Sequence, residues 1–198
     1  MDGDLSLPYS QQRAVLALGD VLLWEGKGIV SSAIRWRTGG RYSHASMVDV
    51  DERFGVRRVW VLESREGKGI QHVPLSNLLR QGHRIAWYTH RAAEGADGIA
   101  PLDREAMAAW AIDRVGDRYD YGAILTWARS VWPWSRVRLS MDDDMELTRT
   151  AVCSAYVSGA AAAGGRDLVM GRAHQHTSPA DLERSALLRY RGHLVWDA

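Results

Sequence analysis

Two valine-rich segments, His44 to Val50 and Val56 to Ser64, lie on either side of a short polar segment that contains a glycine. Both segments alternate apolar and polar side chains, which is typical of two strands joined by a turn, so they predict a β-hairpin. A loop centred just after Arg53 would place His44 directly opposite Glu63. Directly opposed residues of antiparallel strands point to the same face. We therefore expect His44 and Glu63 to be neighbours.

The rest of the chain predicts further short strands interspersed with helices, and hence a mostly antiparallel sheet in an α+β fold. With 198 residues, 46% of them apolar, and with no internal repeat or linker, the chain is expected to form a single domain over residues 1–198. The expected strands are Val21–Trp24, Gly69–Val73, Arg84–His90 and Leu187–Trp196, and the expected helices are Ile29–Trp36, Pro74–Leu79, Pro101–Val115, Ile124–Val131 and Val152–Ala163.

Charge and apolar patterning argue against several classes of protein. The 25 Lys and Arg are matched by 24 Asp and Glu without a long basic run, so we expect no nucleic-acid partner. No apolar stretch approaches the roughly 18 residues of a membrane-spanning helix, so no transmembrane segment is expected. The acidic N-terminus shows no signal peptide, and a lone cysteine suits a reducing compartment. We expect a cytoplasmic protein, consistent with a bacterial or phage origin.

Cys153 stands at the expected start of the helix Val152–Ala163. Unpaired backbone N–H groups and the positive end of the helix dipole stabilise a thiolate there, which is what a nucleophile needs. Its helical neighbours are mostly small or apolar, so a buried, unreactive cysteine on the core face is the alternative.

His44 and Glu63 are the candidates for a general base and its orienting carboxylate. A histidine at a strand start could accept the thiol proton, and a carboxylate beside it could orient the ring and favour the imidazolium form. The alternatives are a hydrogen-bonded core histidine and a solvated hairpin carboxylate.

Six motifs stand in one order along residues 18–185. They are Gly19-Asp20-Val21-Leu22-Leu23, Tyr42-Ser43-His44-Ala45-Ser46-Met47-Val48, Val61-Leu62-Glu63-Ser64 with Gly69-Ile70 and Pro74-Leu75, Gly116-Asp117-Arg118-Tyr119-Asp120, Cys153-Ser154-Ala155-Tyr156-Val157 and Ser178-Pro179-Ala180-Asp181-Leu182. In this order the chain resembles the circularly permuted branch of the NlpC-type papain-like hydrolases, the YiiX/YebB-like group related to lecithin:retinol acyltransferase.

The resemblance implies a permuted papain-like fold, in which the cysteine-bearing helix packs on an antiparallel, barrel-like sheet. It also implies a Cys153 nucleophile, a His44 base and Glu63 as third member, with Tyr119 as an oxyanion or substrate-binding residue, although Tyr119 could equally be a half-buried core residue. The implied chemistry is acyl transfer through a thioester, which requires no cofactor and no metal.

Two further features qualify this expectation. An insert at about 126–150 carries Trp127, Trp132 and Trp134, which could form an acyl-binding lid or a peripheral membrane contact, or simply a packed surface loop. The two histidines of His174-Gln175-His176 suggest a metal site only weakly, because no carboxylate or thiol ligand stands beside them. A loop with a solvated histidine pair is expected instead.

Three functions fit these residues. The first is a thiol hydrolase, an amidase, peptidase or esterase, that cleaves an amide or ester bond in a peptide, a cell-wall fragment or an acyl-lipid. The second is an acyltransferase of the lecithin:retinol type, and the third is a catalytically silent binding module. The motifs do not name the substrate or the oligomeric state.

Overall fold

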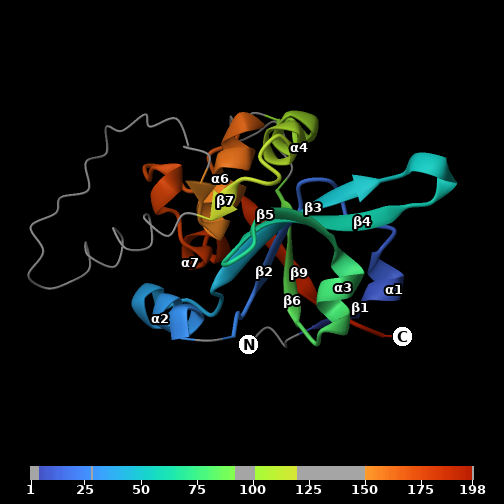
Figure 1. Ribbon diagram of the computed structural model, residues 1–198, viewed down its shortest axis with the longest axis horizontal. Coiled ribbons are helices and arrows are strands. Elements are labelled where there is room, and N and C mark those ends of the chain that lie inside the picture. Colours follow the sequence, from blue (N-terminus) through green and yellow to red (C-terminus); the bar gives the residue numbers. More distant parts are fainter. Residues whose placement is uncertain (1–4, 28, 92–100, 120–149, 198) are drawn as a thin grey trace, which may run out of the picture.

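The computed structural model describes residues 5–27, 29–91, 101–119 and 150–197 (Figure 1). Its strands are β1 (Ser6–Pro8), β2 (Val21–Trp24), β3 (His44–Asp51), β4 (Arg58–Arg65), β5 (Gly69–Pro74), β6 (Ile85–His90), β7 (Arg118–Tyr119), β8 (Thr150–Ala151) and β9 (Leu188–Val195). Its α-helices are α1 (Tyr9–Gln12), α2 (Ile29–Thr38), α3 (Leu75–Arg80), α4 (Arg104–Ile112), α6 (Cys153–Ala163) and α7 (Pro179–Glu183), and two 3-10 helices are η1 (Arg53–Gly55) and η2 (His174–His176).

Seven strands form one sheet in the order β1-β9-β6-β2-β3-β4-β5, and β7 pairs with β8 separately. All neighbours in the large sheet are antiparallel except β1 and β9. Within the described ranges β1 and β5 are its two edges, so the sheet is open rather than barrel-like. The α+β class expected from the sequence is confirmed. The barrel-like closure is not, because the segment 116–117, rather than a further strand, bonds to β5 at Ile70.

The β3–β4 hairpin forms as predicted, but its register differs from the expectation. The 3-10 helix η1, whose first N–H bonds to the Asp51 carboxylate at 2.9 Å, lengthens the loop and moves its centre by one residue. Glu63 therefore faces Ser46 rather than His44. Moving the centre by one residue changes the residue opposite Glu63 by two positions, from His44 to Ser46. Since side chains two positions apart on a strand point to the same face, His44 and Glu63 stay on one face as diagonal neighbours.

The two faces of the sheet carry two apolar cores, and Figure 1 shows α4 and α6 on one side with α1 and α3 on the other. The first core joins strand residues to α4 and α6 through Val21, Leu23, Met47, Leu62, Met107, Tyr156 and Val157. The second joins the opposite face to α1 and α3 through Leu22, Trp24, Val48, Tyr9, Leu75, Leu78 and Leu79. The sheet thus lies between two layers of helices, with an apolar core on each face.

Some helices begin or end at other residues than the sequence predicts. The helix expected from Pro101 begins at Arg104, because the Asp103 side chain accepts the Ala106 N–H at 2.9 Å and caps it there. Helix α2 continues to Thr38, two residues beyond the expectation. The expected helix Ile124–Val131 lies outside the described residues, as do Trp127, Trp132 and Trp134 of the insert.

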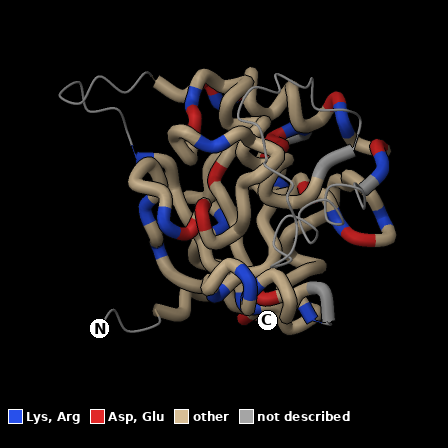
Figure 2. Tube along the Cα trace, turned by 90° about the vertical axis from the view of Figure 1, so that its left-hand side faces the viewer, with Lys and Arg blue, Asp and Glu red and all other residues tan. Residues whose placement is uncertain are grey.

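Acidic and basic residues are interspersed along the described trace (Figure 2), in keeping with a formal charge of +1. Among the helices that the structure describes, none has the length and apolarity needed to cross a membrane.

Candidate active site

The hairpin brings His44 and Glu63 together at the end of the sheet. Nε2 of His44 lies 2.8 Å from Oε2 of Glu63. The Glu63 side chain is fully buried, whereas that of His44 is 14% exposed. The amide of Gln71, directly opposite on β5, donates to Oε1 of Glu63 at 2.5 Å, and the Arg65 guanidinium lies 3.8 Å from the same oxygen. Glu63 is therefore a buried carboxylate with a partner on each oxygen, not a solvated one.

Cys153 is the first residue of α6 and is 4% exposed. Its Sγ lies 4.0 Å from the Ser43 carbonyl oxygen, beside the start of β3. The imidazole of His44 and the backbone N–H groups of Ala45 and Ser154 are close enough to the sulfur to act on the pKa of the thiol. Since Glu63 occupies Nε2, Nδ1 is the ring nitrogen left for the thiol. The structure thus joins Cys153, His44 and Glu63 in one chain of contacts.

The charges of these groups stabilise one another. Burial raises the pKa of the Cys153 thiol, but the His44 imidazolium and the two N–H groups outweigh that effect and lower it. Burial by itself lowers the pKa of His44, but Cys153 and Glu63 raise it to about 9. The pKa of Glu63 is lowered because His44, Gln71 and Arg65 more than offset its burial. These directions favour a thiolate and an imidazolium, the form of the pair that acts as a nucleophile.

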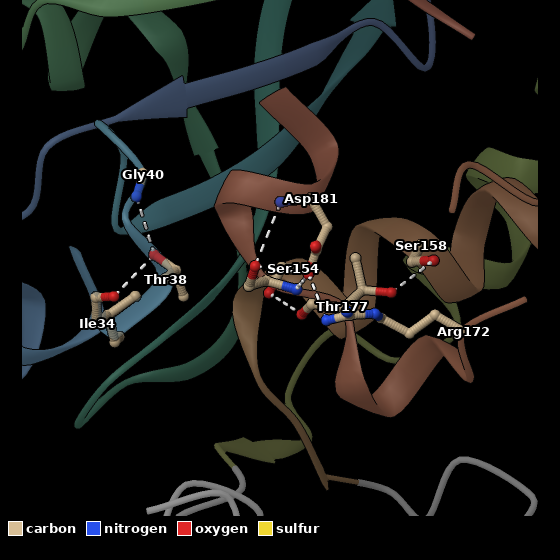
Figure 3. A network of polar contacts seen from close by, with 9 residues as sticks. Ile34, Thr38, Gly40, Ser154, Ser158, Arg172, Thr177 and Asp181 are labelled. Atoms are coloured by element: carbon tan, nitrogen blue, oxygen red, sulfur yellow. Dashed lines mark hydrogen bonds and ion pairs between the residues drawn. The ribbon is translucent and has the colours of Figure 1, made fainter. Parts of the chain in front are cut away.

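Polar contacts behind the helix hold the start of α6 in place (Figure 3). The Ser154 hydroxyl donates to the Thr177 carbonyl at 2.5 Å, and Thr177 is also within 3.4 Å of the buried Ser158 hydroxyl. Ser158 in turn lies 2.9 Å from Nδ1 of His174. The predicted solvated loop at His174-Gln175-His176 is therefore wrong for His174, whose ring is partly buried and bonded to the helix.

A cavity of about 390 Å³ opens beside His44. Trp24 lines it and packs against the imidazole, with ring centroids 4.3 Å apart. Ser43 and the small residue Gly26 also line it, and the Ser43 hydroxyl accepts the Gly26 N–H at 2.8 Å. The cavity gives a ligand access to the ring that contacts Cys153.

Tyr119 is the last residue of β7, and its backbone pairs in parallel with Ala151, two residues before Cys153. Its side chain lies outside the described residues, so its expected oxyanion or substrate-binding role stays a prediction. The backbone pairing does place the segment that ends at Tyr119 beside the start of α6.

The sequence analysis missed Gln71, Trp24 and Arg65. Gln71 faces Glu63 across the turn that joins β4 and β5, and Trp24 faces His44 across β2 and β3. The glycines of that turn, Gly67 and Gly69, were the signal from which the first pairing could have been found. No local signal pairs β2 with β3, because α2 separates them along the chain.

Comparison by sequence gives no matching family model and no matching curated protein. Comparison by structure finds YiiX, a metalloprotein of DUF1105 from Escherichia coli O157:H7, at a TM-score of 0.60 and 16% identity. The match covers 92% of this chain and 99% of that one. The chain is thus similar to YiiX in fold over most of its length.

The donor groups that the structure describes do not form a metal site. Within the described parts of the chain, no group of three or more His, Cys, Asp and Glu side chains is arranged to hold a metal ion.

Proposed function

We propose that this protein is a cysteine-dependent hydrolase of permuted papain-like type, which cleaves an amide or ester bond through a thioester. The observation that supports the proposal is the continuous set of contacts from Cys153 through His44 to Glu63. A lone structural cysteine would need neither a buried imidazole at its sulfur nor a fully buried carboxylate behind that ring. Burying such a carboxylate costs several kcal/mol unless it is paired, so its place beside His44 argues for a role.

The first half of the reaction forms the acyl-enzyme. The Cys153 thiolate attacks the substrate carbonyl carbon, and a carbon–sulfur bond forms. The first N–H groups of α6 have no intrahelical acceptor, and Val152 provides no side-chain cap, so those other than the Ser154 N–H, which acts on the sulfur, can bond the developing oxyanion. The His44 imidazolium then gives its proton to the leaving nitrogen or oxygen as the scissile bond breaks.

The second half releases the acyl group. His44, now neutral, accepts a proton from water while the oxygen attacks the thioester carbonyl. The carbon–sulfur bond breaks, a carboxylic acid leaves, and the thiolate and imidazolium are restored. Glu63 keeps the ring oriented throughout. An amine or alcohol in place of the water would make the enzyme an acyltransferase.

Intact-protein mass spectrometry tests the proposal. The protein is incubated with cell-wall peptides and acyl-lipids, quenched in acid, and examined for an added acyl mass located on Cys153 by peptide mapping. We expect that mass in the wild type and not in Cys153→Ala. Free acid as the product supports hydrolysis, whereas acylated amine or alcohol supports acyl transfer. No adduct and no product from any substrate, together with an unreactive thiol, would support a silent binding module.

A further inference from the structure

We propose that the cavity beside His44 binds an anionic group of the substrate, a carboxylate or a phosphate, through Lys27 and Arg65. This inference rests on the proposed function, because it names a property of the substrate of that site. The observation that carries it is that basic side chains from three separate places in the fold line one cavity.

Each basic residue comes from a different part of the fold. Lys27 follows β2, Arg65 ends β4, and His83 precedes β6, and all three line the cavity together with His44. Glu66 is the single acidic residue among the lining residues that the structure describes. Glu63 is not a lining residue, and its carboxylate is already bonded to His44 and Gln71. Among the lining residues, Lys27 and Arg65 are therefore two permanent cations against the single carboxylate of Glu66, while the charge of His44 is already balanced by Glu63 and the Cys153 thiolate.

The surroundings of the cavity add to this positive field. The Arg35 guanidinium donates to the Gly26 carbonyl at 2.9 Å and lies 3.4 Å from the Ser43 hydroxyl, so a further cation stands directly behind two lining residues. The pKa of His83 is lowered, first by burial and then by Arg65 and Lys27. Burial would disfavour a charge of either sign, but the part of the effect that comes from Arg65 and Lys27 shows that both cations act on the same lining residue.

Hydrogen-bond donors accompany the charge. The Ser31 and Ser43 hydroxyls line the same cavity, and the indole of Trp24 forms an apolar wall next to His44. A carboxylate or phosphate bound by Lys27 and Arg65 would place the rest of the substrate along that wall, toward the ring that contacts Cys153. Cys153 is not among the lining residues, so the acyl group of such a substrate would extend past His44 to reach the sulfur.

The lone cysteine makes a sharp test available, because iodoacetate and iodoacetamide both alkylate thiolates and differ chiefly in charge. The ratio of their second-order rate constants is measured for the wild type, for Lys27→Gln and for Lys68→Gln. Lys68 is an exposed lysine in the β4–β5 turn, outside the lining, and serves as the matched loss of one charge. Arg65→Gln is a less clean variant, because Arg65 also lies near Glu63.

We expect Lys27→Gln to lower the iodoacetate to iodoacetamide ratio by roughly fivefold. Lys68→Gln should change the ratio by less than about twofold, since an exposed charge outside the cavity is screened by salt. An equal ratio in all three proteins, with Cys153 reactive, would overturn the anion site and leave the proposed hydrolase standing.

A second measurement does not depend on the thiol. At constant ionic strength, inorganic phosphate or acetate should raise the melting temperature of the wild type more than that of Lys27→Gln. Stabilisation by phosphate alone indicates a phosphoryl group, and stabilisation by acetate alone indicates a carboxylate. Stabilisation with an inert Cys153 would retain the anion site and refute the hydrolase, whereas no difference between the two proteins would refute the site.

Discussion

The burial of Glu63 is the most demanding feature of the site. A carboxylate with no exposed surface is tolerated only when its charge is matched, and here His44, Gln71 and Arg65 provide the partners. The Cys153 thiolate and, to a smaller extent, the Glu63 carboxylate keep His44 protonated, and the imidazolium in turn stabilises the thiolate. The three groups therefore depend on one another, and removing one should change the ionisation of the others.

The reactivity of Cys153 should reveal this dependence. Alkylation by iodoacetamide, followed against pH, should give an apparent thiol pKa below the roughly 8.5 of a free cysteine, because the thiol pKa is lowered in the folded protein. His44→Ala should move that apparent pKa upward by removing the imidazolium. A thiol that resists alkylation until the protein unfolds would contradict the nucleophile.

Substitutions of Glu63 should separate its charge from its hydrogen bond. Glu63→Gln can still accept a bond from the ring and should lose about tenfold in kcat/KM, whereas Glu63→Ala should lose about a hundredfold. Cys153→Ala should lose more than either. The pH profile of thiol alkylation in Glu63→Gln should also shift upward, which damage to folding alone would not produce. Negligible losses in both Glu63 variants would make Glu63 a structural carboxylate.

The site depends on how β5 is held against the chain near Tyr119. Gly69, the first residue of β5, has φ +75°. A Cβ placed there would lie 2.3 Å from the Asp117 carbonyl oxygen. That oxygen accepts the Ile70 N–H at 2.8 Å, and the Gly116 N–H bonds back to the Ile70 carbonyl at 2.9 Å. These contacts hold β5, the strand that carries Gln71, against the segment that leads into β7, and β7 pairs with β8 directly before α6.

Gly69→Ala should test that contact, with Gly67→Ala as its control. Both glycines have φ +75°, but a Cβ at Gly67 meets nothing within 4 Å. Backbone strain alone should cost about 1 kcal/mol of unfolding free energy in each variant. Gly69→Ala should lose about 1–3 kcal/mol more, because backbone atoms must move apart. Urea denaturation measures the difference, and equal losses would show that the contact contributes nothing.

Local patterns predicted the parts of this fold that depend on neighbouring residues. The Val-rich hairpin and the helix after Val152 follow from alternation and periodicity, and the His44–Glu63 contact survived an error in the loop centre because the register moved by an even number. The order of the strands in the sheet was not predictable in this way. The places of β6 next to β2 and of β9 next to β6 are decided by packing between distant segments, and so is the contact of Trp24 with His44.

Stability as a function of pH should depend on His90, a residue far from Cys153 in the sequence and buried at the end of β6. Its Nε2 donates to the Gly19 carbonyl at 2.9 Å, and Nδ1 has no hydrogen-bond partner within the described residues. Burial lowers the pKa of His90 to about 4, and Arg104 and Arg166 act in the same direction. The folded protein therefore holds this ring neutral.

The sign of the pH effect follows from that lowered pKa. Below the roughly 6.5 of an unfolded histidine, the unfolded chain binds a proton that the folded protein refuses, so stability falls as pH drops toward about 4. At pH 5 the loss relative to neutral pH should be roughly 2 kcal/mol from this residue. His90→Gln should be less stable at pH 7, because a buried bond is disturbed, yet its unfolding free energy should fall less between pH 7 and pH 5. Urea titrations at the two pH values measure this, and an equal fall in both proteins would refute a neutral, buried His90.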